Sequence, residues 1–161
     1  MYMMRKWAVS HAKSYNKAYG VLEKALIKLY PLINKAGNKV GYSRVEKPIV
    51  FVEKTLKSFL FDCQMCGQCV LHDTGMSCPM NCPKELRNGP CGGVRPNGHC
   101  EVKPEMRCVW VEAWRGEKVI NHNESIMHFQ QPLDHQLKGT SSWLKEARKK
   151  RDQQFHKAEA P

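Results

Sequence analysis

Residues 63–108 read CQMCGQCVLHDTGMSCPMNCPKELRNGPCGGVRPNGHCEVKPEMRC, and this stretch decides the fold. It contains every cysteine of the 161-residue chain. Cysteines this closely spaced in a sequence commonly form disulfide bonds, bind zinc or bind iron–sulfur clusters. The eight cysteines are Cys63, Cys66, Cys69, Cys78, Cys82, Cys91, Cys100 and Cys108.

The start of the chain argues against the disulfide alternative. It reads MYMMRKWAVSHAKSY, in which Arg5 and Lys6 are not followed by the apolar run of a secretory signal. No window approaches the roughly 18 consecutive apolar residues of a membrane helix. We therefore expect a cytoplasmic location without membrane attachment, where disulfides are rare. Metal binding is the favoured use of the cysteines.

The spacing of the cysteines bears on how they can bind metal. Cys63, Cys66 and Cys69 form C-x2-C-x2-C, the spacing of bacterial-type ferredoxins. Cys78 and Cys82 form C-x3-C and are each followed by proline, as in the ferredoxin run, and the last three cysteines stand singly. Zinc sites prefer paired C-x2–4-C units, which the triplet fits less well. Two [4Fe–4S] clusters would use all eight thiols, and so would one cluster with one zinc. Which cysteines share a site stays open, and a ferredoxin-like interleaving of the triplet with a late cysteine is one arrangement.

Glycines accompany the cysteines along the segment. They allow backbone N–H groups to approach and hydrogen-bond cluster sulfurs, or they serve only tight turns around zinc. We expect His72 and His99 beside the metal or on the surface, because eight thiols already suffice as ligands. The glycines singled out as cofactor-binding are Gly67, Gly89, Gly92 and Gly93.

Positive charge is concentrated before the cysteine segment. The net charge is +11, and residues 1–60 hold 12 Lys and Arg against 3 Asp and Glu. Residues 61–115 hold six of each. A basic arm can bind nucleic acid or an acidic protein, or can simply be a solvated helix surface.

The remaining pattern predicts helices around a loop-rich centre. Apolar residues at three- and four-residue steps predict an amphipathic helix over residues 10–36, with a kink or break near Tyr30 caused by Pro31. We expect a loop over 37–48, a short helix over 49–61 that leads into Cys63, and Trp110 and Trp114 on one helical face. The polar tail, 116–161, is expected to wrap around a neighbour or to be loosely ordered, with a short helix at 142–157.

The predicted fold is therefore a small, irregular, metal-stabilised α-rich domain. Its parts are a basic amphipathic helix and loop (1–48), a cysteine-rich metal-binding core (49–115) and an extended tail (116–161). Phosphate-binding glycine motifs and nucleophile–base pairs are missing from the sequence, so no catalytic residue is predicted. A carrier or scaffold is favoured over an independent catalyst.

The stretch from Cys63 to Trp114 resembles the methylenetetrahydrofolate reductase C-terminal domain family, and the runs CPMNCPK and NGPCGG carry the resemblance. It implies that all eight cysteines are metal ligands and that Asn88–Gly93 is a glycine signature. It also implies a flavin-containing partner, a (β/α)8 barrel that holds FMN and reduces 5,10-methylenetetrahydrofolate to 5-methyltetrahydrofolate. The small subunit is then a carrier of zinc or [4Fe–4S] centres that passes electrons to that flavin.

These expectations combine into one functional hypothesis and two alternatives. The favoured hypothesis is an iron–sulfur accessory subunit of a methylenetetrahydrofolate reductase, whose basic helix docks on the barrel or on an acidic donor such as ferredoxin. The first alternative is a zinc-binding structural subunit of the same complex. The second is a zinc-ribbon protein that binds nucleic acid, which the lack of interleaved aromatic residues in the cysteine core disfavours.

Overall fold

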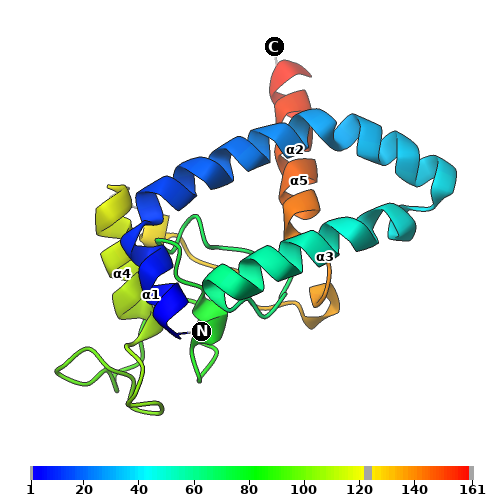
Figure 1. Ribbon diagram of the computed structural model, residues 1–161. Coiled ribbons are helices and arrows are strands. Elements are labelled where there is room, and N and C mark those ends of the chain that lie inside the picture. The colour runs from blue at the N-terminus through cyan, green and yellow to red at the C-terminus, as the bar shows by residue number, and fades with distance from the viewer. Residues whose placement is uncertain (1, 122–124, 160–161) are drawn as a thin grey trace.

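The computed structural model describes residues 2–121 and 125–159, and this part of the chain is helical (Figure 1). It contains no strand, and its sole β-type pairing is an isolated antiparallel bridge between His99 and Arg107. The expectation of an α-rich fold is thereby confirmed. The α-helices are α1 (Tyr2–Ser10), α2 (Ala12–Val40), α3 (Tyr42–Phe61), α4 (Val109–Ile120) and α5 (Ser142–Glu159), and the short 3-10 helices are η1 (Pro79–Asn81), η2 (Ser125–Met127) and η3 (His135–Leu137).

The N-terminal helices are longer than the sequence predicted. The expected loop over 37–48 is wrong, because α2 continues to Val40, α3 begins at Tyr42, and Gly41 alone separates them. Gly41 has a positive φ of 98°, which favours glycine and concentrates the reversal in one residue. Nor does Pro31 break α2, because the 29-residue helix continues on both sides of it; a proline removes one N–H donor from the helix.

Helices α2 and α3 lie along two sides of the molecule, and α5 crosses between them (Figure 1). Side chains of α2 fix that crossing. The Trp143 indole Nε1–H donates to the Tyr19 hydroxyl at 3.0 Å, and Arg148 Nε donates to the Tyr30 hydroxyl at 2.7 Å. Lys150 forms an ion pair with Glu23. The first turns of α5 thus pack on α2 of the same chain, and α5 confirms the helix expected at 142–157. That the tail wraps a neighbour stays a prediction.

Helix α3 buries one pair of oppositely charged residues and exposes several of its large apolar side chains. Glu53 and Lys57 are almost fully buried, at 1% and 2% exposure, whereas Phe51 and Phe59 are 70% and 63% exposed. The apolar residues whose spacing predicted this helix are Leu56, Phe59, Leu60 and Phe61. Of these, Phe61 is buried and Leu60 is partly buried, whereas Leu56 and Phe59 are exposed. An amphipathic pattern therefore located the helix but did not identify its buried face.

A small hydrophobic core lies where α1, α2, the end of α3 and α4 meet the cysteine segment. Its buried members are Ala8, Ala12, Phe61, Leu71, Met76 and Ile120. Gly75 packs directly against the backbone of α4 at Gly116. A Cβ on Gly75 would lie 2.5 Å from the Ala113 carbonyl oxygen, and the φ of Gly75 is +54°. The loop can approach the helix this closely only because both residues are glycines.

Among the described residues, no helix combines the length and the apolar character that crossing a bilayer requires.

We expect Gly75→Ala to lower the free energy of unfolding by about 2–4 kcal/mol, because the added methyl overlaps α4 and the left-handed backbone disfavours alanine. Gly20→Ala is the matched control. Gly20 lies inside α2 with no atom within 4 Å of the added Cβ, and its replacement should be neutral or stabilising by up to about 1 kcal/mol. Denaturant unfolding of both variants measures the difference, and equal stabilities would contradict the close packing.

Candidate metal centres

The eight cysteines line two separate cavities, four in each. Cys63, Cys66, Cys69 and Cys78 line the first cavity. Cys82, Cys91, Cys100 and Cys108 line the second. All eight thiols are free of disulfides. The triplet is thus joined by the next cysteine in the sequence and not by a late one, so the interleaved arrangement is not formed.

The division falls inside the C-x3-C pair. Cys78 immediately precedes η1 and Cys82 immediately follows it, with both in extended backbone conformation. The Cys82 N–H donates to the Pro79 carbonyl at 2.9 Å, which closes the turn between them. Each cysteine of the pair therefore serves a different cavity, and a three-residue turn joins the two sites.

Residues with a left-handed backbone conformation shape the loop of the first cavity. The C-cap of α3, Asp62, has a φ of 54°, and Met65 and Gly67 follow with φ of 49° and 72°. These turns curl the chain so that three cysteines spaced three apart face one cavity. A Cβ on Gly67 would lie 2.7 Å from Thr140 Oγ1 and would overlap the Leu137 carbonyl. The tail therefore closes over this loop.

The second cavity is built by a hairpin-like loop. The Cys100 N–H donates to the Met106 carbonyl at 3.0 Å, and the Cys108 N–H donates to the Gly98 carbonyl at 2.9 Å. Cys108 is also the N-cap of α4, which fixes it to a helix. On the rim, Lys84 forms an ion pair with Glu101, whose Oε1 lies 3.6 Å from Cys91 Sγ.

The pKa values of two cysteines in the first cavity are raised. Burial, with the neighbouring Cys69 and Cys66 thiols, raises the pKa of Cys63 to about 11, although Met65 N–H and Lys57 oppose the shift. Burial, with Cys63 and Cys69, raises the pKa of Cys78 even further. Burial thus favours the neutral thiol at Cys63 and Cys78, and a bound metal group would reverse that preference because its cysteine ligands bind deprotonated.

The thiols of each cavity surround a space instead of meeting at one point. Within residues 2–121 and 125–159, no three His, Cys, Asp or Glu side chains are positioned to hold a single metal ion. The spaces are small, about 20 Å³ in the first cavity and about 10 Å³ in the second. The donor set fits a thiolate-bound metal group in number and chemistry, and loading it would require the loops to adjust.

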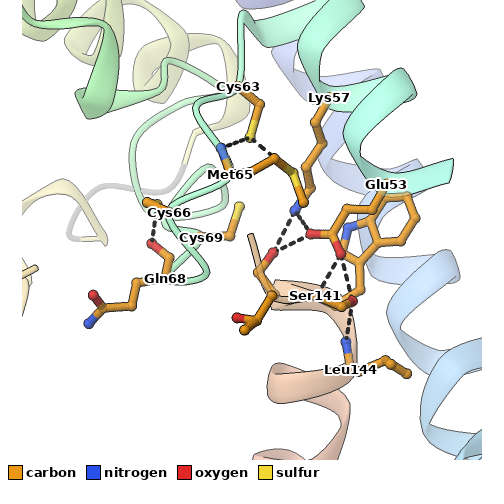
Figure 2. A network of polar contacts seen from close by, with 12 residues as sticks. Glu53, Lys57, Cys63, Met65, Cys66, Gln68, Cys69, Ser141 and Leu144 are labelled. Carbon is orange, nitrogen blue, oxygen red and sulfur yellow. Dashed lines mark hydrogen bonds and ion pairs between the residues drawn. The ribbon is translucent and has the colours of Figure 1, made fainter. Parts of the chain in front are cut away.

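A buried polar network forms one wall of the first cavity (Figure 2). Lys57 Nζ donates to Glu53 Oε1 at 2.6 Å and to Ser142 Oγ at 2.7 Å. Glu53 also accepts bonds from Ser141 Oγ at 2.6 Å and Ser142 Oγ at 2.5 Å. Sequence reasoning missed this pair, because Glu and Lys four apart on a helix normally form a surface ion pair. A usable signal was that both share a helix face with Phe61, which follows Lys57 by four residues and is buried.

A larger groove opens beside the first cavity. It encloses about 570 Å³ between α2, α5 and the cysteine loop, and Cys69 lines both the groove and the cavity. Lys145, Lys149 and Lys150 of α5 lie along it. Cys69 thus connects the first cavity with a partly basic groove.

The other predicted site residues fall into two groups. Gly67 lines the first cavity and Gly93 lines the second, whereas Gly89 and Gly92 line neither. No hydrogen bond to a metal group can be assigned to any of the four, so their cofactor role stays a prediction. His99 Nδ1 lies 2.7 Å from the Pro104 carbonyl, and the exposed His72 lines the groove.

Fold and site together define a small, helical, cysteine-rich protein with two four-thiol cavities. The family model described as "Methylene-tetrahydrofolate reductase C terminal" matches residues 42–136, more than half of the chain. The chain belongs to this family, which confirms the resemblance inferred from the cysteine segment. Comparisons with curated proteins and with solved structures found no match.

We expect Gly67→Ala to detach the tail from the loop of the first cavity, because the added methyl overlaps the Leu137 carbonyl. Residues 133–140 should then exchange amide hydrogens faster, as measured by mass spectrometry. Gly92→Ala is the control, since no atom lies within 4 Å of its added Cβ. Unchanged exchange in both variants would contradict the contact.

Proposed function

We propose that this chain is an iron–sulfur accessory subunit of a methylenetetrahydrofolate reductase complex. In this role it holds two [4Fe–4S] clusters and relays electrons to or from FMN on a (β/α)8-barrel partner. That partner interconverts 5,10-methylenetetrahydrofolate and 5-methyltetrahydrofolate. Support comes from the family membership and, above all, from the division of eight cysteines into two sets of four. Four thiolates are the usual complement of one such cluster.

The chain's own residues supply binding, positioning and shielding. Cys63, Cys66, Cys69 and Cys78 would hold one cluster, and Cys82, Cys91, Cys100 and Cys108 the other. Such clusters supply one-electron transfer when bound. Met65, Leu71 and Met76 are buried around the first site and keep water from it, while Met106 and Trp110 do the same at the second.

The short connection between the sites supports a relay. Cys78 and Cys82 are separated by η1 alone, so charge can pass between neighbouring centres without crossing a domain boundary. Folate reduction takes two electrons, and a flavin can collect them one at a time. The small subunit therefore needs no folate site, in keeping with a sequence from which no catalytic residue was predicted.

The zinc-binding structural subunit is the alternative, and metal analysis distinguishes it. Two zinc ions, each bound by four cysteines, would also use every thiol, and their role would be structural. Zinc and iron–sulfur loading give different colours, metal contents and redox behaviour.

For protein purified without oxygen, we expect about eight iron and eight sulfide per chain, and a visible absorption band that dithionite bleaches. Serine at Cys63, Cys66, Cys69 and Cys78 together should remove half of the iron. Serine at the other four cysteines should remove the other half, so each set is the control for the other. Colourless protein that contains zinc alone, and that supports its reductase fully, would overturn the iron–sulfur proposal in favour of the structural one.

The exposed lysines of α2 are expected to contribute to docking. Charge reversal at Lys13, Lys17, Lys24 and Lys28 should weaken binding of the barrel subunit or of an acidic electron donor such as ferredoxin, and the defect should grow at low salt. Reversal at the exposed Lys54, Lys103, Lys118 and Lys138 is the matched control. Unchanged binding of both partners at low and at high salt would contradict a docking role for α2.

A further inference from the structure

We propose that the buried charge of Lys57 raises the reduction potential of the metal group held by Cys63, Cys66, Cys69 and Cys78. This inference rests on the proposed function and assigns a role to a residue outside the cysteine set. Lys57 acts on the metal group through space and does not ligate it.

The position of Lys57 is fixed on several sides. Its side chain is 2% exposed and extends from α3 into the space between the cysteine loop and the first turn of α5 (Figure 2). Its Nζ bonds to Glu53 and Ser142 and lies 5.6 Å from the Tyr19 ring centroid and 5.1 Å from the Trp143 ring centroid. An ammonium group held this rigidly acts as a fixed charge.

Tyr19 connects this charge to a cysteine ligand. Its hydroxyl oxygen accepts a bond from Trp143 Nε1 at 3.0 Å and lies 3.7 Å from Cys69 Sγ. With the oxygen so occupied, the hydroxyl proton is free to point at the sulfur. Lys57 therefore presents a full positive charge, and Tyr19 the partial positive charge of its hydroxyl proton, to the same side of the site, at Cys69.

The carboxylate of Glu53 cancels less of the Lys57 charge at Cys69 than its own formal charge suggests. Glu53 faces the start of α5, where it accepts bonds from Ser141 Oγ and Ser142 Oγ and lies 3.4 Å from the Trp143 backbone nitrogen. Partial positive charge at a helix N-terminus offsets a carboxylate. The positive end of the ion pair is the end that faces Tyr19 and Cys69.

Reduction adds one electron to a centre already surrounded by thiolates. A nearby buried cation stabilises the reduced form more than the oxidised form, and low-dielectric surroundings strengthen the effect. Lys84 and Glu101, the ion pair beside the second site, are about 40% exposed, so water screens their charges. The two sites are thus electrostatically unequal.

The test is an anaerobic redox titration followed by electron paramagnetic resonance on the full chain. The signal of the first site is the one lost when its four cysteines are replaced by serine. Glu53→Gln should shift the midpoint potential of that signal upward, because Lys57 loses its counter-charge. Adding Lys57→Met to Glu53→Gln should shift it down again. The pair of variants isolates the Lys57 charge and leaves no unpaired buried carboxylate in either protein.

Two comparisons separate an electrostatic role from a structural one. Glu53→Gln with Lys57→Arg keeps the positive charge and should retain the raised midpoint potential of Glu53→Gln. A general loosening of the structure would instead shift the midpoint potential in the same direction in Glu53→Gln and in both of its double variants. Lys84→Met with Glu101→Gln should leave the first signal unchanged. If iron is bound but Lys57→Met has no effect in the Glu53→Gln background, this inference is overturned while the proposed function stands. Protein that binds no iron overturns both.

Discussion

The buried ion pair between Glu53 and Lys57 holds the structure together at its centre. Both charges lie on α3, and the hydroxyls of Ser141 and Ser142 bring the start of α5 to them. Breaking a buried pair by removing one partner commonly costs about 3–5 kcal/mol, because the other charge is left uncompensated. Hydrogen bonds from both charges to Ser141 and Ser142 tie the start of α5 to α3 in this orientation. The wall of the first cavity, and the position of Tyr19 beside Cys69, depend on that orientation.

The sequence predicted the helical class, the family and the candidate ligands, but it did not predict how these parts are arranged. Periodicity identified helices over most of α2 and α3. The Gly and Pro residues in 37–48 suggested a loop there, yet Gly41 alone separates the two helices. Periodicity also places residues on a face without saying which face is buried. In α3 the buried face contains two opposite charges, and only a partner 85 or more residues away, at Ser141 and Ser142, makes that burial possible.

The division of the cysteines could not be predicted for a related reason. Spacing defines which cysteines are neighbours along the chain, such as Cys78 and Cys82, but not which of them share a site. The turn at Pro79–Asn81 separates them, and they line different cavities. The local cue was the proline after each cysteine, which redirects the chain, but its effect depends on where α4 and the tail lie. Membership of the family gives the context of a folate reductase, while the metal group and the redox role remain proposals.

The turn between Cys78 and Cys82 has a mechanical consequence. Four peptide links join the two Cα atoms, so they can never be more than about 15 Å apart even in a fully stretched chain. The two cavities are therefore tethered whatever the outer helices do. Motion of α2 or α5, or a change in their position when another protein is bound, can alter access to Cys69 without separating the first four cysteines from the second four. The covalent chain, and not the surrounding packing, sets the upper limit on the gap that a tunnelling electron would have to cross.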